Sequence, residues 1–167
     1  DEKIKPPSVY ASTKLSGESL SKIILEDTNT NLIISRFFTV YGPYGRPDMS
    51  ILRFIHWIIN EEKVKVFGNG EQKRDFVYVG DVARANILAA ITPNIGSGEV
   101  FNIGSEEQVS INQMIKIIEE IAKYPVQKNY QLDKPKGVRG RSSNNDLVKK
   151  VLNWSYKMSL KEGLTKT

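Results

Sequence analysis

Tyr10 and Lys14 are the first candidates for chemistry, because they lie four positions apart in a stretch that predicts a helix. Side chains at this spacing share one helix face, so a phenol and an ammonium would lie one turn apart. Tyrosine titrates at about pH 10, and a tyrosine base at neutral pH needs about 4 kcal/mol of preferential phenolate stabilisation. A neighbouring lysine has the right sign to supply part of it, so the pair suits proton transfer at a hydroxyl group.

The same spacing recurs at 124–128 and 130–134, where Pro125 and Pro135 disturb the helical geometry that would place the two side chains together. Only the first pair has a clean helical setting. The alternative for Tyr10 is a half-buried aromatic residue at the start of a helix.

The apolar spacing along the chain predicts alternating helices and strands. Residues 9–26 predict an amphipathic helix, with apolar side chains at Leu15, Leu20, Ile23 and Ile24. The apolar run 32–38 predicts a buried strand. Further helices are predicted at 51–59, 81–91, 111–123 and 146–152, with Asp81 and Ser110 as the caps of the second and third of these. Further strands are predicted at 63–67, 73–79, 99–103 and 126–132. This alternation favours an α/β or α+β fold.

The composition is typical of a folded, cysteine-free chain. Its 167 residues are 40% apolar and 26% charged, enough for a buried core in one domain or a large piece of one. With no cysteine and one histidine, His56, we expect no metal centre. Because residues 1–5 are charged and no segment approaches the roughly 18 apolar residues of a membrane span, we expect a cytoplasmic protein without a membrane partner.

The net charge of +5 is compatible with a nucleic-acid surface, an anionic membrane surface, or a pocket for a phosphorylated small molecule. An ordinary basic surface is the simplest interpretation. Since Lys and Arg are scattered without a dense basic run, we do not expect nucleic acid as a partner.

A family resemblance is carried by several segments that follow one another in the chain. They are residues 7–18, 35–43, 66–79 and 101–104, together with 152–154 and 159–164. The first is similar to the active-site helix of extended short-chain dehydrogenases/reductases, in which small residues separate Tyr from Lys and a Gly-Glu pair follows. The others resemble the next strand and turn, the nucleotide-binding hairpin, a following strand and the C-terminal helices of NAD-dependent nucleotide-sugar epimerases and dehydratases. The resemblance spans nearly the whole chain.

This resemblance implies an α/β fold, the C-terminal part of a Rossmann-type extended short-chain dehydrogenase with a small α+β substrate-binding domain. The Gly-rich turn that would bind the pyrophosphate of NAD is absent from this sequence. Residues 1–45 would end the NAD-binding domain and include the active-site helix. Residues 46–167 would mainly form the substrate domain, with 73–103 partly returning to the Rossmann sheet.

The resemblance also implies roles at the cofactor. Tyr10 would accept the proton of a sugar hydroxyl while hydride passes to NAD, Lys14 would bind the nicotinamide ribose, and Phe38 would lie beside the nicotinamide. Thr39 stands where many relatives have an asparagine that contacts the substrate.

For the nucleotide, the resemblance implies that Lys65, Val66 and Phe67 pack on the base and that Arg74 clasps the diphosphate. An arginine suits that task because its planar fork binds phosphate oxygens in pairs. The alternative for Arg74 is a solvated charge at a strand edge.

Two other segments point to different nucleotides. The tail 136–145 is similar to GDP-mannose 3,5-epimerases, in which the second arginine, here Arg141, reaches the diphosphate, and Arg139 lies in the same segment. The segment 41–49 is similar to UDP-glucuronate 4-epimerases instead. A UDP-sugar is therefore the favoured substrate and a GDP-sugar stays open.

The implied reaction is oxidation at sugar C4, a transient keto-sugar, and return of the hydride to the opposite face. A 4,6-dehydratase, a 3,5-epimerase-like enzyme, and a module that binds a nucleotide diphosphate without catalysis are the alternatives. For the longer protein the resemblance implies a homodimer. We expect the isolated chain to be inactive and to bind NAD poorly.

Overall fold

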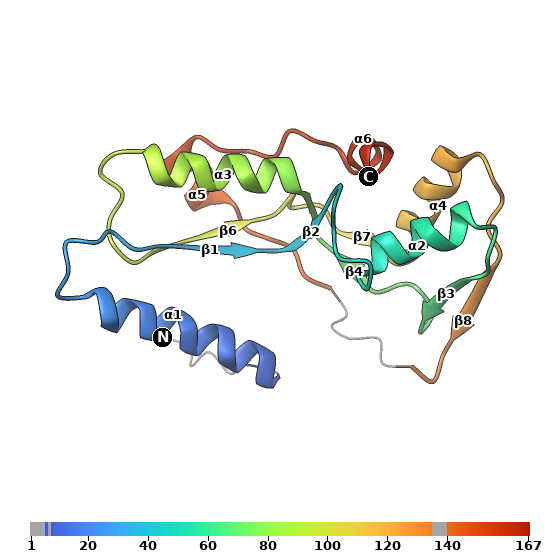
Figure 1. Ribbon diagram of the computed structural model, residues 1–167, viewed down its shortest axis with the longest axis horizontal. Helices are drawn as coiled ribbons and strands as arrows, with labels where there is room; N and C mark the ends of the chain where they lie inside the picture. The colour runs from blue at the N-terminus through green and yellow to red at the C-terminus, as the bar shows by residue number, and fades with distance from the viewer. Residues whose placement is uncertain (1–5, 7, 135–139) are drawn as a thin grey trace.

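The computed structural model describes residues 6, 8–134 and 140–167, which form two bodies, each around its own hydrophobic core. In the first body, β1 (Ile33–Phe37) pairs in parallel with β6 (Glu99–Ile103). Figure 1 shows α1 (Val9–Leu25) on one side of these strands, and α3 (Val79–Ile91) with α5 (Asp146–Leu152) on the other.

The core of the first body draws on distant parts of the chain. Its fully buried side chains include Phe101, Ile103, Val148 and Trp154. The indole Nε1 of Trp154 donates a hydrogen bond of 3.0 Å to the backbone oxygen of Asp81, which ties the end of the chain to α3. Besides residues 73–103, the later residues Val148 and Trp154 thus also contribute to this core.

The second body contains two further strand pairs. β3 (Val64–Phe67) pairs in parallel with β8 (Lys128–Gln131), and β4 (Lys73–Arg74) pairs antiparallel with β7 (Val109–Ser110). The helices of this body are α2 (Ser50–Ile59), α4 (Ile111–Ala122) and α6 (Leu160–Lys166). α4 begins at a capping box, in which Ser110 and Gln113 bond each other's backbone as the predicted cap requires.

A shift of pairing partner joins the two bodies. The chain passes from β1 to β2 (Thr39–Tyr41), which pairs in parallel with β5 (Phe76–Tyr78) rather than with β6. At this step the backbone nitrogen of Phe38 donates to the Ile103 oxygen at 3.1 Å, and that of Thr39 donates to the Asp75 oxygen at 3.0 Å. Phe38 and Thr39 therefore lie at the carboxyl end of β1, where parallel sheets commonly place their ligands.

Two sequence predictions are wrong in detail. The strand predicted over 73–79 is divided at Asp75, because β4 and β5 pair with different partners. Asp81 does not cap α3, which begins two residues earlier; its buried carboxylate instead accepts hydrogen bonds of 3.0 Å from the backbone nitrogens of Lys157 and Met158. The other predicted helices and strands are confirmed to within about two residues at each end.

The helix α1 is poorly covered in this chain. It has no buried residue, and apolar side chains such as Leu20, Ile23 and Ile24 are more than half exposed. Its N-terminus is nevertheless well formed, since the Ser8 hydroxyl accepts a hydrogen bond of 3.1 Å from the Ala11 nitrogen. Within the described residues no helix is long and apolar enough to cross a membrane.

Candidate functional site

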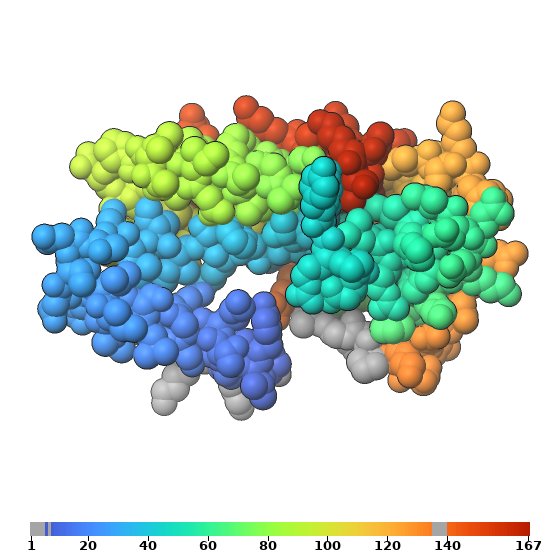
Figure 2. Space-filling model, in the orientation of Figure 1, coloured from blue at the N-terminus to red at the C-terminus, as the bar shows by residue number. Residues whose placement is uncertain are grey.

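A groove formed by three adjoining cavities runs from α1 to α2. The α1 cavity, of about 710 Å³, and the middle cavity, of about 400 Å³, share residues 36–38 and Arg141. The middle cavity and the α2 cavity, of about 440 Å³, share Thr39 and Arg74. Figure 2 shows the molecule hollowed between α1 and the second body, where this groove lies.

Tyr10 and Lys14 line the α1 cavity from one helix face, as their spacing predicts. The Tyr10 side chain is 71% exposed, and the Lys14 Nζ lies 5.5 Å from the centroid of its ring. A cation at this distance is attracted to the aromatic face. The phenol and the ammonium are thus adjacent and both open to the groove.

Phe38 and Thr39 lie in the middle of the groove. Phe38 lines both the α1 cavity and the middle cavity, and Thr39 lines the middle and α2 cavities. Their place follows from the shift of pairing after β1, which brings the two residues to the junction of the two bodies.

Two arginines line the middle cavity from separate segments. Arg74 comes from β4 and Arg141 from the segment that leads to α5. Burial, together with the positive charge of Arg141, lowers the pKa of Arg74 from its ordinary value. Two cations that face one small space create a positive potential there, which suits an anion with several oxygens. Arg139, in the same predicted segment as Arg141, lies outside the described residues.

A buried carboxylate holds the two arginine-bearing segments together. Asp75, which directly follows Arg74, is 1% exposed. Its Oδ2 accepts bonds from the nitrogen and Oγ of Ser143, at 2.8 and 2.7 Å, and its Oδ1 accepts from the nitrogen and Oγ of Ser105, at 2.6 and 2.9 Å. Since Ser143 lies two residues after Arg141, this network fixes one arginine segment against the other.

The α2 cavity is lined by the alternating side chains of β3. Lys65 and Phe67 are exposed and line this cavity, whereas Val64 and Val66 are fully buried in the second core. The Val66 side chain, which we expected to pack on the base, therefore faces the core and does not line this cavity, because side chains alternate between the two faces of a strand.

Two residues of α2 line this end of the groove, and sequence reasoning assigned neither of them to the site. Trp57 belongs mainly to the core, at 9% exposed, but also lines the α2 cavity. Arg53, one turn earlier, lines the same cavity and its guanidinium lies 4.8 Å from the Trp57 ring centroid, while the Lys65 ammonium lies 5.9 Å from it. The four-residue spacing of Arg53 and Trp57 on an amphipathic helix was a usable signal. His56, the single histidine, does not line the groove.

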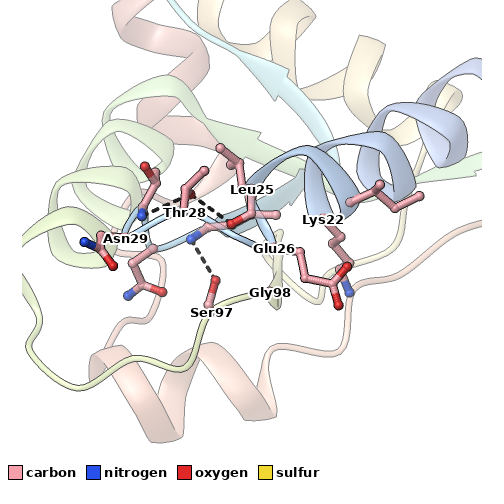
Figure 3. A pocket seen from close by; sticks show the side chains of 11 residues that line it. Lys22, Leu25, Glu26, Thr28, Asn29, Ser97 and Gly98 are labelled. Atoms are coloured by element: carbon pink, nitrogen blue, oxygen red, sulfur yellow. Dashed lines mark hydrogen bonds between the residues drawn. The ribbon is translucent and has the colours of Figure 1, made fainter.

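Another cavity, of about 610 Å³, lies at the opposite end of α1 from Tyr10 and contains none of the predicted site residues. Figure 3 shows Lys22, Glu26 and Asn29 around it, and the Ser97 hydroxyl accepts a hydrogen bond of 3.2 Å from the Leu32 nitrogen. The polar groups here mainly satisfy the turn between α1 and β1. Within the described ranges, no group of three or more metal-binding side chains occurs at any cavity.

The chain is similar to known proteins in sequence and in structure. The sequence model of the NAD dependent epimerase/dehydratase family matches residues 1–104. The UDP-glucuronate 4-epimerase of Thermodesulfobacterium geofontis is 41% identical over 163 residues, which cover 97% of this chain and 50% of that protein. The chain thus spans about half the length of the curated relatives it matches.

Solved structures of epimerases are also similar to this chain over nearly its whole length. The UDP-glucuronic acid 4-epimerase from Bacillus cereus, in complex with UDP-glucuronic acid and NAD, is 34% identical with a TM-score of 0.90, over 99% of this chain and 54% of that one. The UDP-glucose 4-epimerase from Thermotoga maritima, with UDP-glucose, is 33% identical with a TM-score of 0.88, over 100% of this chain and 57% of that one. These similarities confirm the predicted α/β fold.

Proposed function

The chain belongs to the NAD dependent epimerase/dehydratase family, and from this premise we propose that it is the C-terminal part of an NAD-dependent nucleotide-sugar 4-epimerase. The longer protein would oxidise a sugar carbon, form a transient keto-sugar and return the hydride to its opposite face. The observation that carries the proposal is the groove, onto which the Tyr10–Lys14 pair and two arginines open together.

The α1 cavity fits the nicotinamide riboside end of NAD. A phenol, an ammonium and the ring of Phe38 face this space, and these three side chains would hold that end of the cofactor. Bound NAD supplies the hydride acceptor. Its pyrophosphate needs a Gly-rich turn at a helix N-terminus, which this sequence does not contain, so other residues of the longer protein would complete the site.

The residues of this chain would handle the proton of the sugar hydroxyl. The Tyr10 phenolate accepts that proton, and the Lys14 ammonium stabilises the phenolate by its charge and binds the ribose. Thr39, with a hydroxyl that both donates and accepts, would contact the sugar between Tyr10 and the arginines.

The rest of the groove fits a nucleotide diphosphate. Arg74 and Arg141 would bind the diphosphate in the middle cavity, and Lys65 and Phe67 would flank the base in the α2 cavity. We favour UDP over GDP because the similar Bacillus cereus and Thermotoga maritima structures are complexes with UDP-sugars. The same proposal includes a UDP-sugar as substrate and inversion at the sugar carbon rather than elimination of water.

The longer protein would be a cytoplasmic homodimer. The support for association is the apolar surface of α1, where Val9, Leu20, Ile23 and Ile24 are each at least 55% exposed. Burial of such a surface is favourable in proportion to the apolar area that it removes from water. Light scattering on the full-length protein should give the mass of two chains, and a monomer at high concentration would contradict this.

The test is turnover by the full-length protein of UDP-glucuronate and UDP-glucose, with products followed by nuclear magnetic resonance. A C4-inverted sugar is expected. Tyr10→Phe should lower kcat about 100-fold or more, because the hydroxyl that transfers the proton is lost. Tyr124→Phe, which alters a tyrosine outside the groove, is the matched control. A deoxy-keto-sugar product would identify a dehydratase, and binding without turnover would identify a module without catalysis.

A further inference from the structure

Four side chains capable of charge interactions recur at intervals of four along α1: Tyr10, Lys14, Glu18 and Lys22. At this spacing each lies one turn from the next on the same helix face. Lys14 therefore has two neighbours that attract its ammonium, the Tyr10 phenol on one side and the Glu18 carboxylate on the other.

The structure gives Glu18 a different partner. The Nε of Arg36, on β1, donates to Glu18 Oε1 at 2.8 Å, and its second nitrogen donates to Oε2 at 2.5 Å. Both carboxylate oxygens are thereby engaged in a paired arrangement, which is the strongest geometry for these two groups. The hydrogen bonds from Arg36 lower the pKa of Glu18, and the same bonds raise the pKa of Arg36.

The Lys14 ammonium lies beside the Tyr10 ring. Its Nζ lies 5.5 Å from the centroid of the Tyr10 ring, and among the described residues no ion pair joins it to Glu18. All four groups, Tyr10, Lys14, Glu18 and Arg36, line the same α1 cavity. The ion pair between α1 and β1 is thus within the proposed active site rather than remote from it.

We propose that Arg36 is a positioning residue: by binding both oxygens of Glu18, it prevents that carboxylate from pairing with Lys14 and so leaves the ammonium available to Tyr10. This inference rests on the proposed function, because it assumes that Tyr10 and Lys14 act together. Arg36 acts on Tyr10 and Lys14 through Glu18.

The sign of the effect follows from the charges around the pair. These are Lys14, Glu18 and Lys22 on α1, Arg36 on β1, and Arg141 across the α1 cavity. If Arg36 is lost, the Glu18 carboxylate is shared between the two lysines one turn away, Lys14 and Lys22, and its interaction with Lys14 partly cancels the positive charge beside Tyr10. The phenolate becomes less favourable, so activity that depends on it should begin at a higher pH.

The experiment compares Arg36→Met, Glu18→Gln and the double variant in the full-length protein. In Arg36→Met the pH of half-maximal kcat should rise by about 0.5 to 1 unit. Glu18→Gln should show no upward shift, and the double variant should return to the wild-type profile, because no carboxylate remains to capture Lys14. Lys161→Met, which removes an ion pair with Glu120 in the second body, is the control and should shift nothing.

A second readout does not depend on activity. Acylation of Lys14 by an amine-selective reagent, followed by peptide mass spectrometry without substrate, should slow about twofold in Arg36→Met and recover in the double variant, as expected for formation and loss of a helical Lys–Glu pair. Arg36→Lys, which keeps one donor for Glu18, should show a smaller effect in the same direction and serves if Arg36→Met does not fold.

The outcomes separate the alternatives. Equal shifts in Arg36→Met and the double variant would mean that the charge of Arg36 acts directly on the site, and would overturn the role given to Glu18. An equal loss of kcat in all three variants, with an unchanged pH profile and an unchanged rate of Lys14 acylation, would mean that the ion pair only holds α1 against β1. An inactive wild-type protein would contradict the proposed function instead, whereas the labelling result would still test the contact.

Discussion

At the scale of single residues, Arg74 and Arg141 show how a site is assembled from distant parts of a chain. They are separated by more than sixty residues in sequence and line one cavity. Their approach is opposed by like charge, and the same burial that lowers the pKa of Arg74 strengthens its interaction with an anion. The contribution of each arginine to the proposed nucleotide binding can be measured with single substitutions.

Arg74→Ala should weaken nucleotide binding by roughly 10- to 150-fold, because charge-assisted hydrogen bonds contribute about 1.5 to 3 kcal/mol. The loss should be equal for UDP and GDP, since phosphates carry no base information. Phe67→Ala should change the preference between the two. Calorimetric titration of both nucleotides into the full-length protein is the measurement, with Lys150→Ala, an exposed residue of α5, as control. Unchanged binding in Arg74→Ala would remove this arginine from the proposed clamp.

Asp75→Asn should destabilise the protein by about 2 to 4 kcal/mol, because an amide nitrogen would face donors where a carboxylate oxygen now accepts their hydrogen bonds. Urea unfolding measures the free energy. Asp146→Asn, at an exposed position on α5, is the matched control and should change it by less than about 0.5 kcal/mol. Equal effects of both substitutions would show that the buried network is not the cause.

At the scale of the elements, the contact of α6 with β2 holds the end of the chain against the junction of the two bodies. The Tyr41 hydroxyl, at the end of β2, bonds the backbone oxygens of Ser159 and Leu160 at 3.4 and 3.5 Å. Burial, followed by the charge of Asp81, raises the pKa of Tyr41, so this hydroxyl stays protonated. The helix can approach so closely because Gly163 has no side chain.

Gly163→Ala should destabilise the protein by about 1 to 3 kcal/mol, because the added carbon would lie 2.1 Å from the Tyr41 hydroxyl oxygen. Gly17→Ala is the matched control, since it is also a helical glycine but has no atom within 4 Å of the added carbon. That substitution should stabilise by about 0.5 to 1 kcal/mol through helix propensity. Thermal unfolding of the two variants should move in opposite directions, and shifts of the same sign would contradict this packing.

At the scale of the whole molecule, the proposed function implies that this chain supplies one part of a larger site. The α1 cavity is open beside Tyr10, and α1 has no buried residue. Arg74 and Arg141, which we propose bind the diphosphate, nevertheless line the middle cavity, and the exposed Phe67 lines the α2 cavity. We therefore expect the two ligands to depend differently on the rest of the protein.

The isolated chain should bind NAD at least about 100-fold more weakly than the full-length protein, because the pyrophosphate-binding turn is missing. UDP should lose much less affinity, since the residues proposed to contact it belong to this chain. Calorimetry with each ligand on both proteins is the measurement. Tight NAD binding by the isolated chain would place the cofactor site elsewhere.

The sequence by itself determined most of the local structure. Apolar periodicity located most helices and strands, because burial of one face repeats at the period of the element. The four-residue spacing of Tyr10 and Lys14 was sufficient to predict a shared face, since helix geometry alone sets that relation.

Only the tertiary structure decided which distant groups meet. The division of 73–79 at Asp75 depends on pairing with β7 and β2, which no local pattern encodes. The burial of Val66, the convergence of Arg74 with Arg141, and the pairing of Glu18 with Arg36 likewise depend on contacts between separate elements. Such contacts are set by long-range packing and by the satisfaction of buried polar groups, and these are properties of the folded chain as a whole.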